Sequence, residues 1–169
     1  MNTKSPPDDN RLTQTLENLA RLLTGRDWKL ATAESCTGGW IAKCCTDLAG
    51  SSSWFDRGFI TYSNEAKQQM LAVEEESLLS HGAVSEAVAK QMAEGARKHA
   101  AVSVALSVTG IAGPDGGTKE KPVGTVWFGW ALDGQQTRTQ VMQFAGDRDA
   151  VRRQTVDHSL NRLLTLLKN

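Results

Sequence analysis

The chain has 169 residues, of which 40% are apolar, and this fits a single domain with a sizeable core and excludes a disordered chain. Nineteen Lys and Arg residues balance nineteen Asp and Glu residues, so no net charge draws the protein to nucleic acid or to an anionic membrane. No apolar run approaches the roughly 18 residues that span a bilayer, and the first ten residues lack the apolar stretch of a signal peptide. We therefore expect a cytoplasmic protein that binds neither nucleic acid nor membranes.

The cysteines and histidines give no sign of a metal centre. Cys36, Cys44 and Cys45 form an odd set with two adjacent members, which is typical of reduced thiols rather than of a disulfide framework. Neither they nor the three histidines have the paired spacing of a zinc site. We expect no metal and no cofactor.

The N-terminal part of the chain is predicted to form a tail, a helix, a strand and a second helix. Residues 1–10 contain two prolines and almost no apolar side chain, which predicts a frayed tail, with a single domain over residues 11–169. Helical spacing of apolar residues up to a cap at Gly25 predicts an amphipathic helix; these residues are Leu12, Leu16, Leu19 and Leu23. Residues 29–33 (KLATA) are predicted as a buried strand and residues 40–50 as a helix.

The middle of the chain continues the alternation of strands and helices. A second strand is predicted at residues 59–62, a polar helix at residues 64–71, and a longer helix after Ser85. Over residues 102–109, apolar side chains alternate with small ones, which predicts a strand whose small face a ligand or a helix can approach closely.

The C-terminal part predicts a hairpin and a long helix. A glycine-rich loop over residues 109–124 precedes two strands, at residues 125–132 and 137–144, joined by a turn at Asp133-Gly134. A helix entered through residues 146–148 completes the chain. Helices that first alternate with strands and then give way to a hairpin predict a three-layer α/β/α domain, with a mostly parallel mixed sheet of about five strands that includes an antiparallel strand.

Three polar segments follow predicted strands, where ligands gather in such sheets: AESCTGG, TYSNEAK and TGIAGP. Ser35 lies at a strand-to-helix turn, which suits a nucleophile or an anion site. The alternative is that Ser35 and Thr37 only cap the next helix.

In the second segment, Asn64 is predicted as a helix N-cap, and Lys67 then stands at the third helical position. A cation there opposes the helix dipole. Either Lys67 is a solvated surface residue, or its amine is needed in the pocket. A desolvated lysine beside a serine can lose its proton and act as a base.

Other residues are weaker candidates for the nucleophile, the base or the anion site. Cys36 is a rival nucleophile, but no histidine is placed to activate it, and the three histidines are predicted to lie on the surface. The loop at residues 110–117 matches neither a P-loop nor a dinucleotide motif; it either offers oxyanion donors or is a flexible loop. At the start of the last helix, Arg148 is our choice of anion clamp, whereas Arg152 and Arg153 can simply be solvated.

Five segments, in the same order, resemble the CinA C-terminal domain family: AESCTGG at residues 33–39, YSN at 62–64 with Lys67, GAVSE at 82–86, TGIAGP at 109–114 and KPVGTV at 121–126. The resemblance covers about residues 12–168. The stand-alone bacterial members are nicotinamide-nucleotide amidohydrolases. It therefore implies hydrolysis of the carboxamide of nicotinamide mononucleotide, giving nicotinate mononucleotide and ammonia.

The resemblance also implies a serine nucleophile, Ser35, with Lys67 and Tyr62 as helpers, and Thr109 and Arg148 as further site residues. Further residues expected to line the substrate site are Thr37, Gly38, Asn64, Gly110 and Gly113. The alternative function is a catalytically silent module that binds a nucleotide or a partner in the same pocket. Trp40 and Trp54 stand in segments that look partly exposed, which predicts self-association as a dimer.

Overall fold

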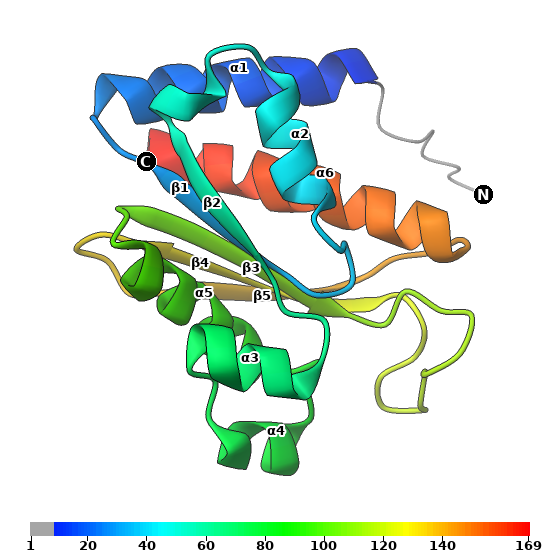
Figure 1. The fold of residues 1–169 in the computed structure, drawn as a ribbon. Helices are drawn as coiled ribbons and strands as arrows, with labels where there is room; N and C mark the ends of the chain where they lie inside the picture. The colour runs from blue at the N-terminus through cyan, green and yellow to red at the C-terminus, as the bar shows by residue number, and fades with distance from the viewer. Residues whose placement is uncertain (1–8) are drawn as a thin grey trace.

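The computed structural model describes residues 9–169, which form a five-stranded sheet between two layers of helices (Figure 1). The strand order is β2-β1-β3-β4-β5, with β1 spanning Leu30–Glu34, β2 Phe55–Ile60, β3 Val104–Gly110, β4 Thr125–Leu132 and β5 Arg138–Gln143. β1 pairs in parallel with β2 and β3, whereas β4 is antiparallel to both of its neighbours. Only β4 runs against the other strands, so the predicted three-layer fold with a mostly parallel mixed sheet is confirmed.

One layer of helices contains α1 (Asp9–Gly25), α2 (Trp40–Asp47) and α6 (Arg148–Lys168), and the other contains α3 (Asn64–Leu71), α4 (Glu75–His81) and α5 (Glu86–Ala100) (Figure 1). A single 3-10 turn, η1 (Ser51–Ser53), precedes β2. The larger apolar core, which includes Trp54, Phe128 and Trp130, lies under the first layer. No helix of the described residues combines the length and the apolar character needed to cross a bilayer.

The small face of β3 is covered by a helix, one of the two predicted alternatives. The Ser107 hydroxyl on this face donates a hydrogen bond of 2.6 Å to the carbonyl of Ala89 on α5. On the neighbouring strand β4, a Cβ at Gly129 would lie 2.6 Å from the same carbonyl oxygen. The small side chains therefore let α5 pack directly on the sheet.

Several sequence-based predictions differ from the structure. β2 begins at Phe55 rather than Phe59, because it is an edge strand whose half-exposed side chains do not give the pattern of a buried strand. α4 was not predicted, since seven residues are too few for a helical period to emerge. α1 begins at Asp9, inside the predicted tail; the rest of that tail lies outside the described residues.

Two aromatic side chains are also more buried than predicted. Trp54 is only 1% exposed and packs in the core, so it does not support the predicted dimer. His158 is half-buried rather than on the surface, with its ring 4.8 Å from that of Phe128, and burial lowers its pKa. Self-association stays a prediction, now without Trp54 as its support.

The carboxyl ends of β1, β2 and β3 meet at one edge of the sheet (Figure 1). The turn at residues 35–39, the connection at residues 61–63 and the loop at residues 111–124 leave the strands there. These are the three polar segments singled out in the sequence. The fold therefore gathers them at the edge where open α/β sheets bind ligands.

Candidate active site

Ser35 and Lys67 are in direct contact at this edge. Ser35 follows β1, and its backbone N–H donates to the carbonyl of Val108 on β3, which fixes the residue to the sheet. The Nζ atom of Lys67, on α3, lies 3.0 Å from the Ser35 hydroxyl oxygen. Lys67 is only 1% exposed, so the alternative of a solvated surface lysine is wrong.

The Lys67 amine has two further hydrogen-bond partners, the carbonyls of Thr61 at 2.9 Å and Tyr62 at 3.3 Å. The charged amine thus has an acceptor for each of its N–H bonds. In the neutral amine, the two carbonyls accept the remaining N–H bonds, and the lone pair is left for the Ser35 hydroxyl proton. The same geometry therefore fits both protonation states of Lys67.

Burial shifts the pKa values of Lys67 and Cys36 in opposite directions. Loss of hydration lowers the pKa of the Lys67 amine, against the attraction of a Cys36 thiolate. Burial also raises the pKa of Cys36 to about 12, partly offset by its own backbone N–H. Cys36 is therefore a neutral thiol near pH 7, so it neither holds a proton on Lys67 nor competes as a nucleophile.

Lys67 reaches Ser35 because of where α3 begins. The N-cap is Ser63, whose hydroxyl accepts a hydrogen bond of 3.0 Å from the N–H of Ala66. The prediction of Asn64 as N-cap is wrong: Asn64 is the first helical residue and is exposed. Both serine and asparagine are good caps, so sequence alone did not separate these neighbours. Lys67 consequently stands at the fourth helical position.

The turn after Ser35 is held by a buried carboxylate, that of Glu34 at the end of β1. Its oxygens accept hydrogen bonds from the Thr37 hydroxyl at 2.6 Å and from the backbone N–H groups of Ile41 and Ala42 at 2.8 and 3.0 Å. The predicted alternative of Ser35 and Thr37 as caps is thus wrong, because Glu34 satisfies the first turn of α2.

Glycines allow this turn to form. Gly38 and Gly39 have φ values of +59° and +100°, in the left-handed region that side chains disfavour. Gly38 is exposed at the turn, whereas Thr37 is fully buried. Of these two predicted substrate-binding residues, Thr37 therefore does not present its side chain to a ligand, since its hydroxyl donates to Glu34.

Arg148 joins the other two segments. Its guanidinium donates to the carbonyl of Gly113, at 2.8 Å, and to the Tyr62 hydroxyl, at 3.3 Å. The Tyr62 side chain is 64% exposed and contacts Arg148 rather than Ser35, while its backbone carbonyl contacts Lys67. Tyr62 and Arg148 thus border the site on its solvent side.

Thr109 and Gly110 support the site from behind. The buried Thr109 hydroxyl donates to the carbonyl of Ala83, 2.9 Å away, before the start of α5. At Gly110, a Cβ would lie 2.7 Å from a methyl carbon of Val126 on β4. Thr109 thus ties β3 to the segment before α5, and Gly110 lets the end of β3 approach β4 closely.

Sequence reasoning missed two residues that shape the turn after Ser35. Glu34 stands inside the recognised motif, and a carboxylate ending a buried strand is a signal in itself, because such a charge needs partners. Arg152 was passed over in favour of Arg148, yet it donates to the carbonyls of Cys36 and Thr37 at 3.1 and 3.2 Å. Its partners are backbone atoms of a distant segment, so nothing in the sequence pointed to them.

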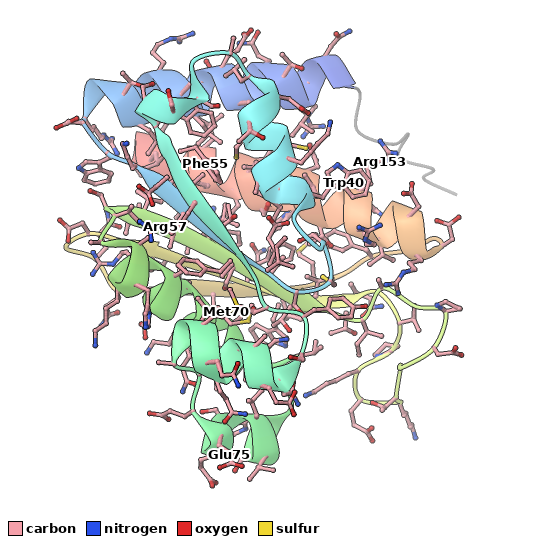
Figure 2. All side chains as sticks on the ribbon, in the orientation of Figure 1. Trp40, Phe55, Arg57, Met70, Glu75 and Arg153 are labelled. Atoms are coloured by element: carbon pink, nitrogen blue, oxygen red, sulfur yellow. The ribbon has the colours of Figure 1, made fainter. Side chains whose placement is uncertain are left out.

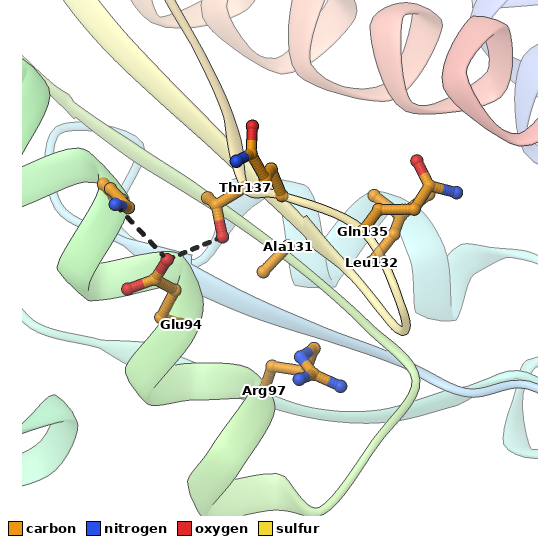
Figure 3. A pocket seen from close by; sticks show the side chains of 8 residues that line it. Glu94, Arg97, Ala131, Leu132, Gln135 and Thr137 are labelled. Atoms are coloured by element: carbon orange, nitrogen blue, oxygen red, sulfur yellow. Dashed lines mark hydrogen bonds and ion pairs between the residues drawn. The ribbon is translucent and has the colours of Figure 1, made fainter.

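Two cavities of the described residues are not lined by Ser35 or Lys67. One, of about 410 Å³, lies between α5 and the β4–β5 hairpin, where Glu94 contacts Thr137 and Lys90 (Figure 3). It is at the opposite end of the sheet, since its lining residue Leu132 pairs with Val104, the first residue of β3. The other, of about 360 Å³, lies between α1, α2 and α6. Over residues 9–169, no three metal-ligating side chains gather.

Comparison with known proteins identifies the family. The model of the CinA C-terminal domain matches residues 12–167. The chain is 56% identical over 155 residues to the nicotinamide-nucleotide amidohydrolase PncC of Escherichia coli K12, covering 92% of this chain and 94% of the relative. The PncC of Enterobacter agglomerans is 53% identical, with coverage of 92% and 95%.

Solved structures of this family have the same fold as this chain. The competence damage-inducible protein A of Klebsiella pneumoniae superposes with a TM-score of 0.90 at 41% identity, covering 94% of this chain and 98% of that one. The competence/damage inducible protein of Agrobacterium tumefaciens gives 0.91 at 39% identity, with 99% and 100% coverage. The chain therefore belongs to the CinA C-terminal domain family.

Proposed function

We propose that this protein is a nicotinamide-nucleotide amidohydrolase that converts nicotinamide mononucleotide to nicotinate mononucleotide and ammonia. The observation that carries the proposal is the contact of 3.0 Å between the buried Lys67 amine and the Ser35 hydroxyl. The substrate is supported by the two relatives named for this activity, which match nearly their whole length.

In the first step, the Ser35 hydroxyl oxygen attacks the carboxamide carbon, and the neutral amine of Lys67 takes the hydroxyl proton. Burial prepares Lys67 for this role, because it lowers the pKa of the amine. The carbonyls of Thr61 and Tyr62 keep the amine in place as it becomes charged. The carboxamide oxygen carries the negative charge of the tetrahedral intermediate and needs N–H donors.

In the second step, the bond between the carboxamide carbon and nitrogen breaks. The Lys67 ammonium returns its proton to the departing nitrogen, which leaves as ammonia, and an acyl-Ser35 ester remains. Lys67 is then neutral again and takes a proton from a water molecule that attacks the ester. The Ser35 oxygen leaves and is reprotonated by Lys67, which releases nicotinate mononucleotide and restores the starting state.

Arg148 and Tyr62 border the site on its solvent side, and we assign the nucleotide end of the substrate to this side. Arg148 holds the Gly113 carbonyl and the Tyr62 hydroxyl, and its guanidinium has further N–H donors for a phosphate. We assign the phosphate clamp to Arg148 and a bordering role to Tyr62. In this assignment, Lys67 supplies the proton to ammonia, and the Tyr62 hydroxyl assists without being the main acid.

Incubation of the purified protein with nicotinamide mononucleotide tests the proposal by release of ammonia and of the nicotinate nucleotide. The matched control is Ser35→Ala, which removes only the nucleophile. Product formation by the wild type and its loss in the variant support the proposal. A thermal shift with the nucleotide but no product from the wild type would instead indicate a silent binding module.

A further inference from the structure

The turn that follows Ser35 is held by hydrogen bonds from two sides. From inside, the Glu34 carboxylate binds the Thr37 hydroxyl and the start of α2. From outside, Arg152 of α6 donates one N–H to the Cys36 carbonyl and another to the Thr37 carbonyl. The consecutive peptide groups after Ser35 are therefore fixed in orientation by a single planar guanidinium.

The hydrogen bonds from Arg152 determine where the N–H groups of the turn point. The peptide group between Cys36 and Thr37 is trans, so its N–H, which belongs to Thr37, points away from the carbonyl that Arg152 binds. Arg152 belongs to the helical layer of α1, α2 and α6, whereas Lys67 stands on α3 in the opposite layer (Figure 1). The Thr37 N–H is thus turned away from α6.

The neighbouring N–H groups are occupied differently. The N–H of Ser35 donates to Val108, and that of Gly38 donates to the Ser35 carbonyl at 3.1 Å. Among the partners that the described part of the chain provides, none accepts from the Thr37 N–H. This group is two residues beyond the proposed nucleophile, and no protein acceptor would have to be displaced from it by a reacting oxygen.

We propose that Arg152 is a positioning residue for catalysis: by holding the Cys36 and Thr37 carbonyls, it aims the Thr37 N–H at the oxyanion that forms on attack by Ser35. The inference rests on the proposed function. Arg152 itself does not touch the substrate. It acts through the peptide group, which must already be oriented when negative charge develops.

The chain offers a matched control next to Arg152. The guanidinium groups of Arg152 and Arg153 lie at nearly equal distances over the Trp40 ring, 5.2 and 5.3 Å from its centre, and Figure 2 shows Arg153 beside Trp40. Arg153 bonds instead to Asp149 on its own helix, away from the turn. Arg153→Gln therefore removes the same charge and a similar aromatic contact but leaves the turn held.

The experiment compares the wild type, Arg152→Gln and Arg153→Gln in two assays. The first is steady-state hydrolysis of nicotinamide mononucleotide, and the second is the rate at which an alkyl fluorophosphonate labels Ser35. This probe carries a polar P=O oxygen but no nucleotide phosphate, so its rate reports the nucleophile and the oxyanion donors alone. Circular dichroism verifies that each variant is folded, and Arg152→Lys is the second variant if Arg152→Gln does not fold.

We expect Arg152→Gln to lower both kcat and the labelling rate by about 10- to 100-fold, below the loss for removing an oxyanion donor outright, with little change in KM. Arg153→Gln should stay within about twofold of the wild type in both assays. An increase in KM with unchanged kcat and labelling would overturn the inference and make Arg152 a substrate ligand. Equal losses in both variants would also overturn the inference, since the contact with the Trp40 ring, which both arginines make, would then explain them.

Failure of the proposed function has a different signature. Wild-type protein that releases no product, or labelling that persists in Ser35→Ala, would contradict the proposed amidohydrolase. A wild type that is active and labelled at Ser35, together with a fully active Arg152→Gln, would contradict only the positioning role.

Discussion

Replacing Lys67 by arginine tests whether the buried amine acts as a base. The change keeps a positive charge and N–H donors near Ser35 but removes a proton that can be given up, because arginine stays charged at any assay pH. Loss of a positioned general base lowers kcat by about 10²–10⁴-fold, which corresponds to about 3–5 kcal/mol of activation free energy. The Lys67 amine lies within hydrogen-bond distance of the Ser35 hydroxyl, at 3.0 Å, and is buried. We therefore expect Lys67→Arg to show a loss of kcat of this size.

The pH dependence of wild-type kcat tests the same idea without a substitution. Only the neutral amine accepts the Ser35 proton, so kcat should rise with pH through the pKa of Lys67. Burial lowers this pKa, and the rise should therefore be centred below the value of about 10.4 of a free lysine. A Cys36 thiolate would oppose the shift, but with a pKa of about 12 the thiol stays neutral across the assay range.

The control for Lys67→Arg is a measurement of binding. Arginine is larger than lysine, and overpacking costs about 1–3 kcal/mol, so the variant must be shown to give a thermal shift with nicotinamide mononucleotide. Substantial turnover in a folded arginine variant would refute the base assignment and make Lys67 a charged ligand of substrate or oxyanion. A wild-type kcat that does not change with pH below 10 would refute it independently.

Four further outcomes are expected. Ser35→Ala should lower kcat by several orders of magnitude while Cys36→Ala stays active, as ammonia release would show; the reverse result would make Cys36 the nucleophile. Tyr62→Phe should reduce kcat far less than Lys67→Arg, since the Tyr62 hydroxyl contacts Arg148; an equal loss in single-turnover assays would assign it the acid role. Glu34→Gln should lower the free energy of unfolding in urea by about 1–3 kcal/mol through lost acceptors, and an unchanged midpoint would contradict this. Exhaustive chelation should leave turnover intact, because Ser35 and Lys67 are the proposed nucleophile and base; rescue of a lost rate by one divalent ion would show otherwise.

The elements that sequence predicted well are those with a strong hydrophobic period. α1, α5 and α6 each bury one face, and the β4–β5 hairpin has its turn residues in place. The bounds predicted for β2 were wrong because an edge strand is partly exposed and need not have an apolar sequence. The start of α3 was displaced by one residue because Ser63 and Asn64 cap equally well in principle.

The contact between Ser35 and Lys67 lies where the resemblance implies it, while their catalytic roles stay predictions. The two residues that hold the turn were not foreseen for a common reason. Glu34 and Arg152 act largely on backbone N–H and C=O groups, which every residue has, so no side-chain pattern marks their partners. Sequence can point to such a residue only through the rule that a buried charge needs partners. This rule applies to Glu34, which is fully buried, but not to Arg152, which is only partly buried.

The same low-dielectric surroundings explain why serine rather than its neighbour is suited to be the nucleophile. Burial disfavours charge, so it pushes Lys67 toward the neutral amine and Cys36 toward the neutral thiol. The first effect favours the amine form that the proposed base needs, whereas the second disfavours the thiolate that would make Cys36 reactive. A more exposed turn would reverse both, with a charged lysine and a more acidic thiol. The separate burial of these two side chains therefore favours Ser35 over Cys36 as the proposed nucleophile.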